Sequence, residues 1–241
     1  MTTHVKLTEE QWAAAARGAG ASFSGPLAPL ITGPSTTGEW TTTVAVLAAG
    51  DVTVDVLGSC GGQAWLGRVA RRGVAHASAV RTLVPGPGDG SHVGVVPGLE
   101  LGRGTTGMVE SVLRLVPGLR GNDASPPVVA LPTARVGAVF AALREGAGGG
   151  AGGARRTVLD QLGWSDVPDE IASLERVDGD LTLTVSAPGR RTRVVRLLHG
   201  RGGWVVVEAG VDGLRYRRAT TGWLRAELAW ELTRGPDVEA G

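Results

Sequence analysis

The spacing of apolar and polar positions changes along the chain from a helical to a strand period. Residues 8–17 have Thr8 at an N-cap position, Gln11 at the capping-box position and an alanine-rich body, which predicts a helix. Residues 39–48 fit a helix or a strand equally well. Beyond them, apolar residues recur at every second position between glycine-rich turns, which predicts an antiparallel meander. Its strands are residues 52–57, 64–71, 75–84 and 93–96, and a helix at residues 108–116 follows.

The second part of the chain has the same order of elements. Residues 132–143 place Val136, Val139 and Leu143 at helical spacing and predict a helix. The strands that follow are predicted at residues 181–185, 192–198, 204–208 and 214–217. A closing helix begins at a Thr-Thr-Gly sequence, where a threonine can cap the first turn. Its apolar stripe is Trp223, Leu224, Leu228 and Leu232.

Two pairs of similar sequences mark these parts as copies of one module. GDVTVDV at residues 50–56 matches GDLTLTV at 179–185, and RGTTGM at 103–108 matches RATTGW at 218–223. We therefore expect an internal duplication, with a first α+β half at residues 1–120, a second at 126–235 and a tail at 236–241. Joining the two sheets edge to edge would cover exposed strand edges, which predicts one compact α+β fold with a central, mostly antiparallel sheet.

Composition narrows the function classes. The formal net charge is +1, from 24 basic and 23 acidic residues, so no global field favours nucleic acid or an anionic membrane. Cys60 is the only cysteine, which excludes an internal disulfide and a thiolate metal site. The N-terminus has no basic flank followed by an apolar stretch, and no run of 18 apolar residues occurs. We expect a cytoplasmic protein without stable membrane insertion.

Little in the sequence indicates catalysis. Gly102, Gly104 and Gly107 spell the GxGxxG pattern of dinucleotide sites, but the matching residues of the second half are Arg217, Ala219 and Gly222. Only one glycine recurs, so a structural interpretation is favoured, and an anion or nucleotide site at residues 102–107 stays as the alternative. The four histidines show no HxH or HExxH spacing. We expect no catalytic residue, no metal and no cofactor, and therefore a protein that is not an enzyme.

Arginines and tryptophans are the residues from which a binding surface could be built. Arg215 and Arg217 alternate along a strand and would share one face, which is most simply a solvated face of the sheet and alternatively a docking surface for an acidic protein partner. Most of the tryptophans are expected in the core. Trp223 and Trp230 are seven residues apart on the closing helix and would lie on similar faces. Trp12, near the N-terminus, is a further candidate anchor.

The order of elements resembles the EspG family, the cytosolic chaperones of actinobacterial type VII (ESX) secretion systems. The resemblance rests on ALPTARVGAVFAAL at residues 130–143, TVLDQLGW at 157–164, the strand run from GDLTLTV, and TTGWLRAELAWEL at 220–232, with their counterparts in the first half. It implies two similar halves around a central, mostly antiparallel sheet with flanking helical bundles. It also implies a chaperone that keeps a helical-hairpin client of PE/PPE type soluble. A third interpretation is a self-associating protein whose paired modules form a homodimer, so we expect a monomer or a homodimer. Our candidate contact residues for that client are Trp223, Trp230, Arg215 and Arg217.

Overall fold

The computed structural model describes residues 3–33, 38–85, 93–104, 107–146 and 152–234. Over these residues the fold is α+β, with eleven strands and seven α-helices, and the pairings between neighbouring strands are antiparallel. The predicted tail at 236–241 lies outside the described residues. The chain forms two compact units, which do not coincide with the two halves in sequence. Unit 1 comprises Met1–Pro117, Thr182–Val194 and Arg225–Gly241, and unit 2 comprises Gly118–Leu181 and Val195–Leu224.

The sheet of unit 1 confirms the predicted meander and adds strands to it. Its strands are β1 (Thr3–Leu7), β2 (Val52–Cys60), β3 (Gln63–Arg72), β4 (Ala75–Pro85), β5 (Val93–Val95) and β6 (Leu99–Gly104). They lie in the order β1-β6-β4-β3-β2, and β5 pairs with β4. On its other side β2 neighbours β8 (Gly179–Ser186), of which residues 182–186 belong to this unit. Neither β1 nor β6 was predicted from the sequence.

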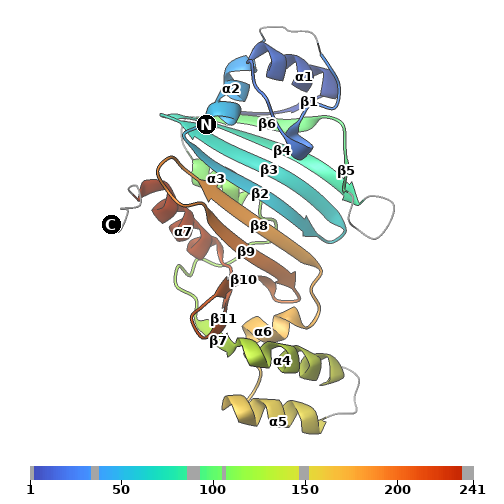
Figure 1. Ribbon diagram of the computed structural model, residues 1–241, viewed down its shortest axis with the longest axis vertical. Coiled ribbons are helices and arrows are strands. Elements are labelled where there is room, and N and C mark those ends of the chain that lie inside the picture. Colours follow the sequence, from blue (N-terminus) through green and yellow to red (C-terminus); the bar gives the residue numbers. More distant parts are fainter. Residues whose placement is uncertain (1–2, 34–37, 86–92, 105–106, 147–151, 235–241) are drawn as a thin grey trace. The chain divides into compact units, whose positions relative to one another are not determined.

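Two helices of unit 1 cover one face of this sheet. They are α1 (Glu9–Gly18) and α2 (Thr41–Ala49), which pack on each other, and α2 packs on β3 and β4 (Figure 1). The capping box of α1 is confirmed, because the Gln11 amide donates to the Thr8 hydroxyl and the Thr8 amide donates to the Gln11 side chain. The ambiguous stretch at residues 39–48 is resolved as the helix α2.

A shorter helix, α3 (Met108–Leu113), lies on the opposite face. Ala77 of β4 packs in the apolar cluster under α1 and α2, whereas its neighbour His76 contacts Ser111 of α3. Alternate residues of a strand point to opposite faces, so α3 and α1 lie on different sides of the sheet. The helix ends three residues before the predicted Val116, in turns between Val112 and Leu115 and between Leu113 and Val116. The predicted threonine cap at residues 105–106 lies outside the described residues.

Unit 2 holds a second antiparallel set of strands. These are β7 (Val128–Pro132), β9 (Arg193–Gly200), β10 (Gly203–Ala209) and β11 (Gly213–Arg218), in the order β9-β10-β11-β7. The first two residues of β9 belong to unit 1. The helical segments are α4 (Thr133–Gly146), α5 (Gly152–Leu162), α6 (Asp169–Ala172) and the 3₁₀ turn η2 (Ser173–Glu175). Helices α4 and α5 lie side by side (Figure 1).

The last helix, α7 (Thr221–Thr233), contributes to both units, since unit 2 ends at Leu224 and unit 1 resumes at Arg225. No helix within the described ranges combines the length and apolar character needed to cross a bilayer.

The same order of pairing occurs in each half of the sequence. In the first half, β1 precedes two helices and pairs antiparallel with β6, the strand that leads into α3. In the second half, β7 precedes three helices and pairs antiparallel with β11, the strand that leads into α7. The first strand of each half therefore closes against the last one.

Candidate functional site

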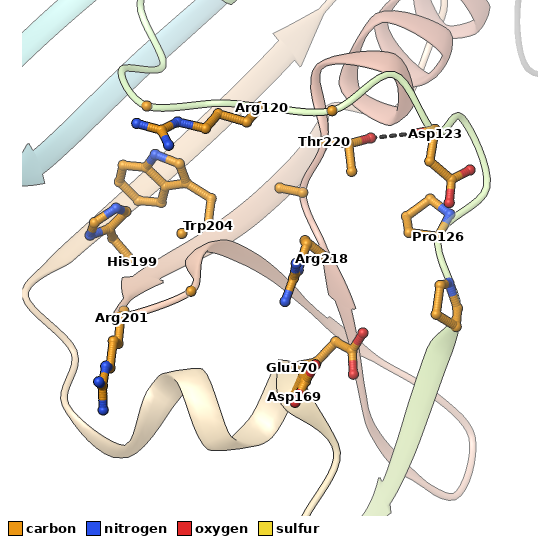
Figure 2. A pocket seen from close by; sticks show the side chains of 17 residues that line it. Arg120, Asp123, Pro126, Asp169, Glu170, His199, Arg201, Trp204, Arg218 and Thr220 are labelled. Atoms are coloured by element: carbon orange, nitrogen blue, oxygen red, sulfur yellow. Dashed lines mark hydrogen bonds between the residues drawn. The ribbon is translucent and has the colours of Figure 1, made fainter.

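A pocket of about 740 Å³ opens within unit 2 (Figure 2). Four segments that are far apart in sequence form its walls. They are the end of β9 with its turn into β10, the end of β11 up to Thr220, the start of α6, and the connection from Gly118 to Pro127. The pocket is thus built by the fold and has no counterpart in any local sequence motif.

Close packing fixes the β9–β10 turn on one wall. The Arg201 amide donates to the Ser173 carbonyl at 3.1 Å, which holds the turn against η2. A Cβ atom at Gly200 would lie 1.9 Å from that carbonyl oxygen, so only glycine allows this approach. Gly203 has a φ of 102°, a backbone conformation that also favours glycine.

The Thr-Thr-Gly sequence of the second half fixes the opposite wall. The Thr220 hydroxyl accepts a hydrogen bond from the Trp223 amide at 2.9 Å, which confirms the predicted threonine cap of α7. The same hydroxyl donates to the Asp123 carbonyl, as Figure 2 shows. Gly222 lies against the connecting segment, and a Cβ there would be 2.2 Å from the Asn122 carbonyl oxygen. In the second half, the motif therefore forms a helix start that is held against a crossing chain segment.

Charged side chains of both signs line the pocket. Arg120, Arg201 and Arg218 are exposed, and among the described residues their guanidinium groups have no ion-pair or hydrogen-bond partner. The same holds, over the described part of the chain, for the carboxylates of Asp169 and Glu170. With Asp123, the lining carries three basic and three acidic side chains. The pocket can therefore bind charged groups without first breaking an internal ion pair.

His199 is held at the basic side of the pocket. Its Nδ1 lies 2.5 Å from the Asp178 carboxylate, and its ring meets the edge of the buried Trp204 at 4.9 Å between centroids. The hydrogen bond with His199 lowers the pKa of Asp178, and Arg176 adds to the effect. Among the described lining residues only Thr220 carries a hydroxyl, and both of its hydrogen bonds serve the fold. The arrangement is equipped for binding by charge and hydrogen bonding.

The structure brings three of the four predicted contact residues together on one side of unit 2. Arg215 and Arg217 flank the buried Tyr216 on β11 and share a face, as the alternation predicted. Arg217 donates to Glu208 at 2.8 Å and lies over the Trp223 ring at 5.6 Å. Trp223 is only 4% exposed, so its ring is unavailable to a partner. Arg215 is exposed and has no ion pair within the described ranges.

The fourth residue, Trp230, lies on the solvent side of α7. It is 58% exposed, and the Arg234 guanidinium lies 5.1 Å from its ring centroid. Exposed small residues surround it on the helix, namely Ala226, Ala229 and Thr233. The two tryptophans of α7 therefore differ in exposure, and the Arg217 guanidinium lies over the ring of the buried Trp223.

Two other sequence candidates have structural explanations. Trp12 is fully buried, donates to the Leu27 carbonyl at 3.1 Å and contacts the Phe23 ring, so the prediction of an N-terminal anchor is wrong. Gly102 lies in β6, which is antiparallel to both β1 and β4, unlike the parallel strand of a dinucleotide site. A Cβ at Gly102 would lie 2.5 Å from the Ser78 hydroxyl oxygen, which accounts for this glycine by packing.

Sequence reasoning missed the pocket itself. Its charged residues come from separate parts of the sequence and meet only after four segments fold together. In comparisons with known proteins, no family model matches the chain and no curated protein matches it.

Proposed function

We propose that this protein is a non-enzymatic chaperone or adaptor of the type VII (ESX) secretion system. It binds a helical-hairpin substrate of PE/PPE type in the cytoplasm and keeps it soluble for export. The observation that carries the proposal is the pairing of β1 with β6 and of β7 with β11, which gives both halves the same strand order. That order supports an internal duplication and the resemblance to the EspG family, whose members have two similar halves.

The helices support the same proposal. In each half, the helices follow the first strand and precede the meander, as α1 and α2 do in one half and α4 to α6 in the other. In this proposal the two groups are the flanking helical bundles of the family. The two groups offer surfaces that differ in sequence for client binding.

Trp230 is the strongest candidate for a client contact. A 58% exposed tryptophan is costly to leave in water, and tryptophan is enriched among residues that dominate interface energies. The small exposed residues Ala226, Ala229 and Thr233 let another helix approach α7 closely. Arg215, exposed and without an ion pair among the described residues, is our second contact residue.

The test compares client capture by the tagged wild type and by Trp230→Ala from the native cytosol. We expect a helical-hairpin protein with the wild type and at least about tenfold less of it with the variant, as for a central interface tryptophan. Val74→Ala is the matched control, because Val74 is 83% exposed and lies in the turn between β3 and β4. Equal capture by all three proteins would remove Trp230 from the interface. If the wild type captured no helical protein, the proposed function would be wrong.

A further inference from the structure

The charges of the pocket in unit 2 are sorted by sign. Figure 2 shows Arg120 and Arg201 at one side, with His199 and Trp204, and Asp169 and Glu170 at the other, on α6. The side chain of Arg218 lies between them, and its Nη2 atom is 3.8 Å from the Cβ position of Gly202. The pocket therefore has a basic wall and an acidic wall.

Charge balance excludes a simple anion as the best ligand. The three arginines are offset by Asp123, Asp169 and Glu170, so the lining is close to neutral at pH 7. An anion would gain attraction from one wall and meet repulsion from the other. A ligand with separated positive and negative groups would gain attraction from both walls, because electrostatic complementarity at a binding site requires opposite signs to face each other.

The charged lining favours a segment of a protein over a small molecule. The volume of about 740 Å³ falls within the range for small-ligand pockets, so size alone does not decide. Six of the lining side chains are charged and most of these are exposed, as at the polar rim of a protein interface.

We propose that the pocket binds a mixed-charge segment of the helical client. An acidic side chain of that segment meets Arg120, Arg201 or Arg218, and a basic side chain of the same segment meets Asp169 or Glu170. The inference rests on the proposed function and names the chemistry of the client surface that the chaperone recognises. It also assigns a role to Arg201 and Arg218, which line the pocket and form no ion pair within the described residues.

The experiment reverses each wall separately and measures capture of the client from native cytosol. We expect Arg201→Glu and Glu170→Lys each to lower capture about fivefold, because each removes one exposed attraction and adds a repulsion of similar size. Arg156→Glu is the matched control, since Arg156 lies on α5 of the same unit with its side chain 80% exposed, and among the described residues its ion pair is with Asp160. Thermal unfolding of each variant confirms that the fold is kept.

The outcomes separate the pocket from the proposed function. A client with acidic groups alone would bind better to Glu170→Lys, and one with basic groups alone would bind better to Arg201→Glu. Either result, or unchanged capture by both variants, overturns the mixed-charge inference. The chaperone proposal still holds in these cases if the wild type captures the helical client. If the wild type captures no helical protein, both proposals fail.

A photo-crosslinker at Pro127, which lines the pocket, gives an independent readout. The crosslinked client peptide should carry both an acidic and a basic residue. Val211, 95% exposed in the β10–β11 turn, is the control position. A peptide with charges of one sign, or crosslinks from Val211 but none from Pro127, would contradict the inference.

Discussion

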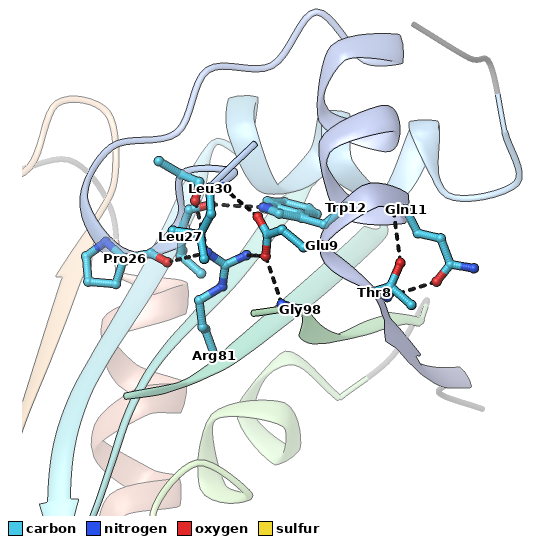
Figure 3. Close-up of polar contacts among 10 residues, drawn as sticks. Thr8, Glu9, Gln11, Trp12, Pro26, Leu27, Leu30, Arg81 and Gly98 are labelled. Carbon is cyan, nitrogen blue, oxygen red and sulfur yellow. Dashed lines mark hydrogen bonds and ion pairs between the residues drawn. The ribbon is translucent and has the colours of Figure 1, made fainter. Parts of the chain in front are cut away.

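The Glu9 carboxylate lies 2.9 Å from the Arg81 guanidinium, and both side chains are buried (Figure 3). Glu9 also accepts hydrogen bonds from the amides of Leu30 and Gly98. Arg81 donates to the carbonyls of Pro26 and Ala28. The pair thus ties the first turn of α1 to the segment around η1 (Gly25–Leu27) and to the start of β6.

Breaking this pair from one side should destabilise unit 1 strongly. Arg81→Met leaves a buried carboxylate without its cation, and we expect a loss of about 3 kcal/mol in the free energy of unfolding. The double variant Glu9→Gln, Arg81→Met should recover part of that loss, because no uncompensated charge remains buried. Urea unfolding of the single and double variants measures the coupling. If Arg81→Met were as stable as the wild type, this account of the Glu9–Arg81 pair would be wrong.

Glycine substitutions should separate packing from helix propensity. Gly222→Ala places a Cβ against the Asn122 backbone, so we expect a loss of about 2 kcal/mol. Gly137→Ala in α4 meets nothing within 4 Å and should stabilise the protein by about 0.5–1 kcal/mol. The denaturant midpoints of the two variants measure both stability changes. Similar effects of the two substitutions would show that the wall at Gly222 is not tightly packed.

His76 should make stability depend on pH. Burial lowers the pKa of His76, and the nearby Arg114 and His4 lower it further, while its Nε2 contacts the Ser111 hydroxyl at 3.3 Å. Below the ordinary histidine pKa of about 6.5, the unfolded chain therefore binds more protons than the folded protein. The contribution of His76 is present above that pH and is lost as the pH falls through it.

The variant His76→Gln removes this titration. We expect its free energy of unfolding to fall less than that of the wild type between pH 7.5 and 5.5, where the carboxylates contribute least. Parallel pH profiles for the two proteins would assign the pH dependence to other groups.

Truncation of the two tryptophans of α7 should affect the stability of the protein to very different extents. Trp223→Ala removes a buried ring under Arg217 and should cost about 3–5 kcal/mol of stability. Trp230→Ala removes an exposed ring and should change stability by less than about 0.5 kcal/mol. Thermal unfolding distinguishes them. A large loss for Trp230→Ala would mean that its ring supports the fold and would weaken its role as a client contact.

Elements with a local signal could be predicted from the sequence. The capping box at Thr8 and Gln11 and the period-two strands of the meander are examples, since each depends on neighbours a few residues away. The strands β1 and β7 are only five residues long and form by pairing with the distant strands β6 and β11. Their existence depends on those partners, so propensity alone could not find them.

The candidate site depends still more on long-range contacts. Helical spacing gave the relative rotation of Trp223 and Trp230 about α7, but which of them is covered depends on Arg217 of β11. The walls of the pocket join residues from Gly118 to Thr220, so no window of sequence contains them. The glycines that hold those walls, such as Gly200, are explained only by the backbone that each one meets.

The most direct test of the central claim is native mass spectrometry of the wild-type protein, affinity-purified from its own cytosol. We predict a discrete complex of this chain with one helical-hairpin pair. Recovery of the protein alone, or only with a bound small molecule, would contradict the chaperone proposal.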